Sequence, residues 1–366
     1  MSELAQAPHV AYGQKPSLPA PTARSRGLIH IFFGDLLSVC LTIATGALLL
    51  ALLPKVLDWA ILSGVWDGDG AACKAGGACW AFLRDKYRQI LFGVYPAGEQ
   101  WRPATATMMI LAVALWSLPP RNWTRTTLTL WLVCMAAVLG LMSGGIFGLA
   151  SVPTTSWGGI VITLLLTVSA IGLGFPIAVV LALGRRSKMK VVSLISVSVV
   201  EIVRGLPLLS LLFIASILLP LMLPDGVSID KLLRAMVALT LFSAVYLAEV
   251  LRGGLQGVPS GQAEAAHALG LGWWHTTRLV VLPQAIRKVI PPLTNTVIVM
   301  VKNTSLVLVL GLFDLLSSGR AAATDPAWPA PYVESYLFVA TIYFAICFSI
   351  SRYAYWLESR GADNAR

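Results

Sequence analysis

The strongest constraint on the fold is a series of apolar segments, most of them long enough to cross a lipid bilayer. A spanning helix needs about 20 mostly apolar residues, because the hydrocarbon core is about 30 Å thick and cannot satisfy open backbone groups. Only 12% of the 366 residues are charged, against about 25% in a soluble domain. We therefore predict an all-α polytopic membrane protein with about eight transmembrane helices. The expected spans are residues 36–53, 104–118, 128–144, 158–184, 206–223, 232–251, 290–312 and 336–356.

The apolar segments divide the chain into four parts. Residues 1–30 contain no apolar stretch with a small-residue cleavage site, so we expect a cytoplasmic tail and not a cleaved signal peptide. Residues 31–156 form an N-terminal membrane extension with three spans and a periplasmic loop at about 54–103. Residues 157–357 form a core of about five helices, and residues 358–366 are a C-terminal tail.

One apolar region is too long for a single span. Residues 191–223 would make a helix of about 50 Å, which exceeds the hydrocarbon core. Gly205, Leu206 and Pro207 divide the region. We expect an inclined segment before this break and a span after it.

Positive charge sets the expected orientation. Basic tracts at 121–125, 185–190 and 278–288 fall on one side, together with both termini and loop 258–283, and short cytoplasmic loops carry the excess of Lys and Arg. The periplasmic loop is an exception to this rule. It carries Lys74, Arg84, Lys86, Arg88 and Arg102. The formal net charge of +10 does not favour a nucleic-acid partner, since the basic residues lie in short tracts between apolar segments.

The loop at 54–103 contains an amphipathic pattern. Its apolar residues recur at helical spacing, with charged residues on the other side. They are Trp80, Leu83, Tyr87, Ile90 and Leu91. The pattern indicates a helix on the membrane surface, or a small helical hairpin packed on the rest of the protein.

Cysteine and histidine positions indicate no metal site. The four histidines show no metal-ligand spacing. Cys73 and Cys79 lie close together in the same polar loop. They form a disulfide if the loop faces an oxidising compartment, or remain two free thiols.

Residues 258–283 are a polar interruption between two apolar segments. Pro259 and Ser260 can start a helix, with the Ser260 side chain as its cap. Four alanines then give a helix surface with little bulk, and Gly270 permits a turn. A second helical piece follows and ends near Pro283. We expect a smooth helical hairpin on the membrane surface.

This hairpin carries a specific motif. Glu264-Ala265-Ala266, Gly270, Val280 and Leu282-Pro283 resemble the EAA loop of ABC-importer permease subunits, with Val280 where the family prefers Ile. Further matches to the polar amino-acid branch are residues 246–254, Gly261-Gln262 and 302–306, with Asn303 where Asp is frequent. The core resemblance covers about residues 157–356. The front portion resembles the larger permease of broad-specificity L-amino-acid uptake systems.

The resemblance implies a function and partners. The chain is expected to be the inner-membrane permease of an ATP-driven amino-acid importer, paired with a second related permease, two ATPase subunits and a periplasmic amino-acid-binding protein. The implied ATPase-coupling residues are Gly261, Gln262, Glu264, Ala265, Ala266, Gly270, Leu282 and Pro283. The chain lacks a G-x-x-x-x-G-K-[ST] motif. We therefore expect a transport subunit with no cofactor and no enzyme activity, with ATP and Mg on the ATPase.

Charged and polar residues in or beside the spans are candidates for the substrate pathway, because they are costly there. They are Glu201, Arg204, Glu249, Lys302, Asn303, Thr304 and Ser305. Alternatively, Glu201–Arg204 and Glu249–Arg252 are structural ion pairs, and Lys302 neutralises a buried carboxylate. An ion-gradient-driven secondary transporter is the alternative function, although such a transporter typically has inverted repeats and an intramembrane acid.

Overall fold

The computed structural model describes residues 32–145 and 148–363, so the predicted tail 1–30 lies outside the described residues. It divides into two units, residues 1–63 and 64–366, which are described separately. The first contains α2 (Leu36–Leu57) and a π-helical continuation, Asp58–Leu62. None of the residues of α2 is buried within the structure, as expected for an apolar helix whose surroundings are lipid.

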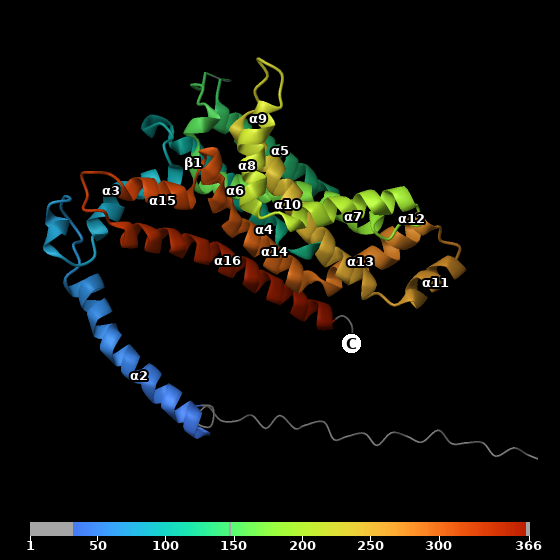
Figure 1. The fold of residues 1–366 in the computed structure, drawn as a ribbon, viewed down its shortest axis with the longest axis horizontal. Coiled ribbons are helices and arrows are strands. Elements are labelled where there is room, and N and C mark those ends of the chain that lie inside the picture. The colour runs from blue at the N-terminus through green and yellow to red at the C-terminus, as the bar shows by residue number, and fades with distance from the viewer. Residues whose placement is uncertain (1–31, 146–147, 364–366) are drawn as a thin grey trace, which may run out of the picture. The chain divides into compact units, whose positions relative to one another are not determined.

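The second unit is almost entirely helical (Figure 1). Its first half contains a 3₁₀ turn at Ala72–Ala75, α3 (Trp80–Phe92), a 3₁₀ turn at Ala97–Glu99, α4 (Trp101–Ser117), a 3₁₀ turn at Pro120–Asn122, α5 (Arg125–Ser143), a 3₁₀ turn at Thr154–Ser156, β1 (Gly158–Gly159), α6 (Ile160–Gly184), α7 (Lys190–Gly205) and α8 (Leu208–Phe213). Its second half contains a π-helical turn at Ile214–Leu218, α9 (Leu219–Leu221), α10 (Lys231–Gln256), α11 (Ser260–Ala268), α12 (Trp273–His275), a π-helical turn at Thr276–Val281, α13 (Leu282–Lys288), α14 (Ile290–Asn303), a 3₁₀ segment at Thr304–Leu310, β2 (Phe313–Asp314), α15 (Leu315–Ala323) and α16 (Tyr332–Asp363).

Helices α6 and α10 form the centre of this unit. Leu165 on α6 and Leu247 on α10 are almost fully buried and belong to the same apolar core. The two short strands pair in parallel, Gly158 with Phe313 and Gly159 with Asp314. They hold the starts of α6 and α15 together, and Asp314 caps α15 by accepting from the amides of Leu316 and Ser317.

The described residues contain six helices that are long and apolar enough to cross a membrane, or seven if one bent pair forms a single span. They are Leu36–Leu62, Arg125–Ser143, Ile160–Gly184, Lys231–Gln256, Ile290–Leu310 and Tyr332–Arg360. The predicted span at 104–118 corresponds to α4, which has 17 residues. At 1.5 Å per residue it is about 26 Å long, shorter than the hydrocarbon core. The all-α membrane fold is confirmed, and the count of eight is not.

The bent pair lies at the predicted break. Helix α7 ends at Gly205, α8 starts at Leu208, and the two directions differ by 101°. Pro207 lacks an amide hydrogen and cannot continue the ladder of α7. The predicted break is therefore present. The piece after it, Leu208–Leu221, reaches the length of a span only together with α7, so the separate span predicted there stays a prediction.

Helix α3 packs on other helices of the second unit. Phe82 and Ile90 are fully buried in a cluster with Leu315 of α15 and Val339 of α16. Tyr87 is 45% exposed, so its assignment to the apolar face was wrong. The buried face is centred on Phe82 and Ile90, two turns apart, and the structure thus favours the packed alternative over the membrane-surface one.

Several positive charges of the 54–103 loop are neutralised. Arg84 pairs with Asp67, and Lys86 Nζ lies 2.7 Å from an Asp325 carboxylate oxygen. Arg102 is fully buried and is not a loop charge. Its side chain donates to the carbonyl oxygens of Leu141, Met142 and Ala150 near the end of α5. These contacts give a physical reason for the exception to the charge rule.

Candidate functional site: a helical hairpin, a charge cluster and a groove

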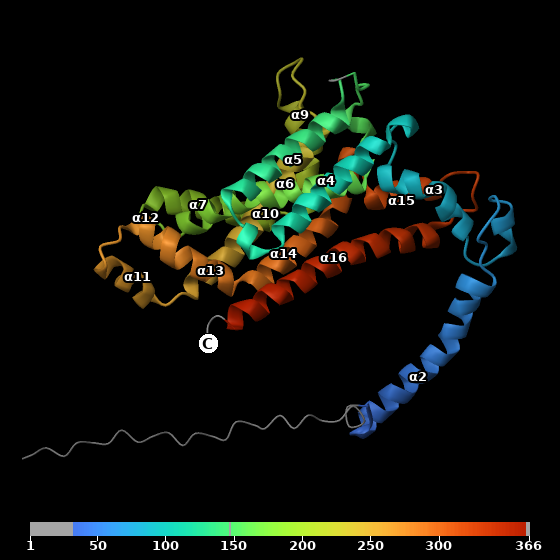
Figure 2. The same cartoon turned by 180° about the vertical axis from the view of Figure 1, so that it is seen from behind.

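The hairpin 258–283 is formed by α11, α12 and the π-helical turn before α13 (Figure 1). Ser260 is the first residue of α11 and Pro259 occupies the cap position, with no side-chain cap hydrogen bond. The predicted Ser260 cap was therefore wrong by one residue. The hairpin projects at one end of the second unit, and α3 lies at the other end (Figures 1 and 2).

Gly270 closes the end of α11. Its amide donates to the carbonyl of His267, and the amide of Leu271 donates to that of Ala266. This is the Schellman arrangement, which requires a left-handed residue after the helix. Gly270 has φ +81° and meets this requirement without a Cβ penalty.

The EAA residues have different surroundings. Gly261, Gln262, Glu264 and Ala265 are exposed, so this face of α11 is open. Ala266 is only 3% exposed and is packed within the chain. Its expected place on the contact surface is therefore not supported; it lets the hairpin elements approach closely.

The two limbs of the hairpin are joined near its base. Gln284 Nε2 on α13 donates to Gln262 Oε1 on α11 at 3.1 Å. Leu282 and Pro283 begin α13 at its first two positions, where proline is tolerated because its missing amide would be unpaired anyway. Among the predicted coupling residues, Leu282 and Pro283 thus anchor the second limb.

A cluster of five charged side chains joins α6, α7 and α10. Glu249 lies 2.8 Å from Arg185 and 3.5 Å from Arg204, and it also accepts from Arg252. Glu201 pairs with Arg185 at 3.0 Å. The pair Glu249–Arg252 is present, but the expected pair Glu201–Arg204 is wrong, because Arg204 turns towards Glu249.

The role of Arg185 was not predicted from the sequence. It belongs to the basic tract that follows α6, which suggested only a cytoplasmic anchor. Its guanidinium reaches both carboxylates of the cluster, as the fork of donors in arginine allows. No local spacing connects Arg185 to Glu249, 64 residues away.

Lys302 faces a groove of about 500 Å³ beside α16. Across residues 32–145 and 148–363, no carboxylate forms an ion pair with Lys302, so the expected buried partner is not supported. Ser305 also lines the groove, whereas Asn303 and Thr304 do not. The other lining residues are Leu316, Tyr336, Val339, Ala340, Tyr343, Phe344 and Cys347.

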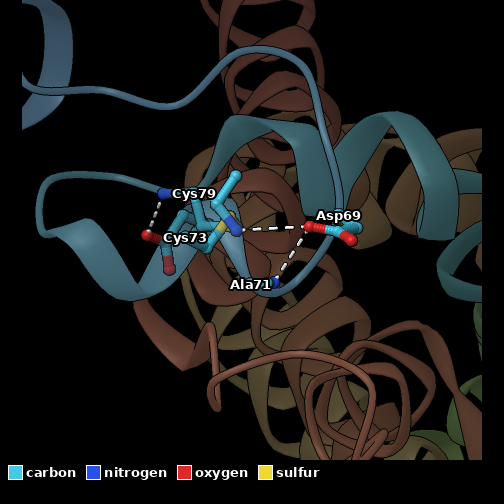
Figure 3. The surroundings of a disulfide bond; sticks show 6 residues. Asp69, Ala71, Cys73 and Cys79 are labelled. Atoms are coloured by element: carbon cyan, nitrogen blue, oxygen red, sulfur yellow. Dashed lines mark hydrogen bonds between the residues drawn. A yellow bond between two sulfur atoms is a disulfide. The ribbon is translucent and has the colours of Figure 1, made fainter.

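Cys73 and Cys79 form a disulfide in the structure, with Cα atoms 5.4 Å apart (Figure 3). Asp69 accepts from the amides of Ala71 and Ala72 and so shapes the turn before Cys73. The amide of Cys79 donates to Glu334 of α16 at 2.7 Å. The disulfide-bonded loop is therefore attached to a long helix of the core.

The described residues contain no group of three or more His, Cys, Asp or Glu side chains able to hold a metal ion.

Known proteins resemble the chain along most of its length. A family model, "Binding-protein-dependent transport system inner membrane component", matches residues 174–362. The inner membrane amino-acid ABC transporter permease protein YhdY of Escherichia coli K12 is 43% identical over 94% of this chain and 96% of its own length. The glutamate/glutamine/aspartate/asparagine transport system permease protein BztC of Rhodobacter capsulatus is 34% identical over 93% of this chain and 95% of its own. A crystal structure of an amino acid ABC transporter with histidines is 34% identical, covering 55% of this chain and 92% of that one, with a TM-score of 0.49.

The chain belongs to the family of binding-protein-dependent transport system inner membrane components. It is a permease of an ATP-driven importer, and no support exists for the ion-gradient alternative. Importer permeases of this kind work with ATPase subunits and a binding protein. The hairpin, the cluster at Glu249 and the Lys302 groove all lie within the matched residues.

Proposed function

We propose that this chain is an inner-membrane permease subunit that imports L-amino acids and couples their passage to separate ATPase subunits. The observation that carries the proposal is the open face of α11 around Glu264 and Ala265, in a motif-bearing hairpin. Two relatives named for amino-acid transport, alike over nearly the full length, support the substrate class.

The hairpin is the proposed contact with the ATPase. Gly261, Gln262, Glu264 and Ala265 form the face that meets the partner, and Gly270 sets the turn. Leu282 and Pro283 pass the motion to α13. ATP and Mg bind the ATPase, and this chain holds no cofactor and performs no hydrolysis.

The Lys302 groove is the proposed part of the pathway on this subunit. Its volume of about 500 Å³ lies within the range of small-molecule sites, roughly 300–1,000 Å³. The ammonium of Lys302 can attract an amino-acid carboxylate, and Ser305 lies beside it. Glu201, Arg204 and Glu249 bind one another or Arg185, and we assign them to closing the pathway near α7.

The proposed orientation places the hairpin and both termini in the cytoplasm. The disulfide-bonded loop then faces the periplasm, where disulfides persist. This arrangement counts α4 as a crossing and gives eight spans in total. A second, related permease completes the pathway, and a periplasmic amino-acid-binding protein delivers the substrate.

Reconstitution tests the function. The chain, its ATPase, the second permease and the binding protein are placed in proteoliposomes, and uptake of labelled glutamate and glutamine is measured. We expect uptake with ATP inside and the binding protein outside, and none from a proton or sodium gradient alone. Gradient-driven uptake without nucleotide would contradict the proposal.

Two substitutions test the assigned roles. Glu264→Lys should reduce ATPase co-purification and uptake together, whereas Glu358→Lys on α16 should leave both within twofold.

Lys302→Met should raise KM about tenfold or more, because a charged hydrogen bond contributes about 1.5–3 kcal/mol, and Lys302→Arg should recover most of the affinity. Unchanged KM in Lys302→Met would remove the groove from the pathway.

A further inference from the structure

The end of α10 contains a carbonyl that the helix itself cannot satisfy. The last four carbonyls of a helix need partners outside the regular ladder. The natural partner of the Leu255 carbonyl is the amide four residues later, but that residue is Pro259, which has no amide hydrogen. Arg186 Nη1, from the turn after α6, donates to the Leu255 carbonyl at 2.9 Å. The contact thus closes the end of α10 immediately before the hairpin.

A second basic side chain meets a carbonyl two residues further along the chain. Lys288, the last residue of α13, donates from Nζ to the carbonyl of Gly257. Arg186, in the turn after α6, and Lys288, at the end of α13, therefore approach the junction of α10 and the hairpin from two different segments. Positive charge is favourable at this position, because the end of α10 carries the negative pole of its dipole.

Close backbone packing accompanies these contacts. A Cβ added to Gly254 would lie 2.7 Å from the carbonyl oxygen of Ala285 and 2.7 Å from Val289 Cγ1. Ala285 is fully buried. Helices α10 and α13 are thus in contact at a point where only glycine fits, and the two limbs of the hairpin share a rigid base.

Helix α6 is separated from the hairpin by a cavity, unlike α10 and α13, whose backbones are in contact. A cavity of about 210 Å³ lies between the end of α6 and the hairpin limbs. Its lining includes Leu183 on α6 and Arg186 in the turn after it, Leu255 on α10, and residues from both limbs of the hairpin, such as Ala263 and Thr277. Because this space separates the elements, Arg186 forms a direct polar link across it, while Arg185 holds α6 to Glu249 one turn and a half earlier on α10.

We propose that Arg186 and Lys288 are positioning residues for energy coupling. With Gly254 and Ala285 they form a clamp at the base of the hairpin. The clamp makes a displacement of the hairpin move α6, α10 and α13 together, where residues 257–259 would otherwise bend. The inference rests on the proposed function, since it assigns a mechanical role within ATP-driven transport.

The coupling ratio tests the clamp. In proteoliposomes of the full complex, ATP hydrolysed per amino acid imported is compared for wild type, Arg186→Ala/Lys288→Ala and Lys188→Ala. Lys188 is the matched control, because it lies in the same basic turn and makes no hydrogen bond or ion pair within residues 32–145 and 148–363. We expect a rise of at least fivefold in the double variant and less than twofold in the control, with ATPase co-purification retained. Lys288→Arg should keep the wild-type ratio.

An unchanged ratio in the double variant overturns the clamp and leaves the proposed function intact. Absence of ATP-dependent uptake by the wild-type complex instead contradicts the proposed function. The two failures are therefore distinguishable.

A second measurement applies even if the double variant does not assemble. Gln262→Cys and Gln284→Cys are joined by a reducible bifunctional thiol reagent, with Cys40, Cys134 and Cys347 replaced by Ala. If the limbs move as one body, the cross-linked complex imports within twofold of the same variant modified at both cysteines by a monofunctional reagent, which accounts for any loss of contact between position 262 and the ATPase. Transport that stops on cross-linking and returns on reduction would show that the limbs must separate, and would overturn the proposal.

Discussion

At the scale of single residues, helix ends in this protein are completed by specific polar side chains. Arg102 reaches the last carbonyls of α5, and Asp314 accepts from the first amides of α15. Buried backbone groups without a partner are costly, more so away from water. These side chains therefore determine where one helix stops and how its neighbour is placed. Substitutions of these side chains should lower the free energy of unfolding by more than their small number of contacts suggests.

Replacing Gly270 should loosen the hairpin. Gly270→Ala places a side chain at φ +81°, which costs about 1–2 kcal/mol. The amide of Leu271, bonded to the Ala266 carbonyl, should then exchange hydrogen about 5–30 times faster. Gly270→Asn should have a smaller effect, because Asn tolerates the left-handed region. Gly272→Ala is the control, since Gly272 has φ −67°; equal effects at 270 and 272 would contradict the argument.

Replacing Arg102 should destabilise the contact between α4 and α5. Arg102→Met leaves the carbonyls of Leu141 and Met142 without this donor, and we expect a loss of about 3 kcal/mol. Arg125→Met, at the exposed start of α5, should change stability by less than about 0.5 kcal/mol. Unfolding of the detergent-solubilised protein by heat or by denaturing detergent measures both. Equal stability of the two variants would show that the Arg102 contacts contribute little.

At the scale of elements, α3 is attached to the core by contacts of several kinds. Phe82 packs edge-on against Trp328, with ring centroids 5.7 Å apart, and Lys86 pairs with Asp325. Glu334 accepts from the amide of Cys79. All these partners come from the segment that joins α15 to α16 or from the start of α16, so the disulfide-bonded loop and this segment should move together.

The Lys86–Asp325 pair predicts a specific pH dependence. The hydrogen bond from Lys86 holds the pKa of the Asp325 carboxyl below its usual value, and the hydrogen bond to Asp325 raises the pKa of the Lys86 ammonium. The Asp325 carboxylate therefore contributes its full stabilisation of this contact above pH about 4 and loses it as pH falls further. The Lys86 ammonium contributes its full stabilisation below pH about 10.5 and loses it above. Hydrogen exchange of residues 324–331 should be protected evenly between pH 5 and 9, after correction for intrinsic rates. Asp325→Asn should lack, at every pH, the part of the protection that the wild type loses below pH 4. A transition of the wild type near pH 7 would contradict this account.

At the scale of the whole molecule, local patterns predicted more than distant contacts. The break at Gly205–Pro207 and the turn at Gly270 follow from the backbone properties of proline and glycine, and both are present in the structure. The partner of Glu201 could not be predicted, because helix spacing suggested Arg204 and tertiary packing brings Arg185 closer. Burial of Ala266 depends on how the limbs of the hairpin fold together, which the alanine-rich sequence leaves open.

Within the second unit, the hairpin and α3 lie at opposite ends of the spanning helices. Helix α16 begins beside α3 and ends on the side of α13 (Figures 1 and 2). If the helices cross the membrane, a cytoplasmic hairpin therefore places α3 and its disulfide-bonded loop in the periplasm. This relation does not depend on how many segments precede residue 64.

Labelling from each side of the membrane tests that relation. Ala265→Cys on α11 and Arg88→Cys on α3 are both at exposed positions, and each is made with Cys40, Cys134 and Cys347 replaced by Ala. In intact cells with a permeable outer membrane, an impermeant thiol reagent should label the variant at 88 and not the variant at 265. In inverted vesicles from cells that lack the ATPase subunit, which would otherwise cover position 265, the result should be reversed, because only the hairpin then faces the medium. Labelling of both positions from the same side would mean that the spanning helices do not cross the bilayer as proposed, and would separate the hairpin from any cytoplasmic ATPase.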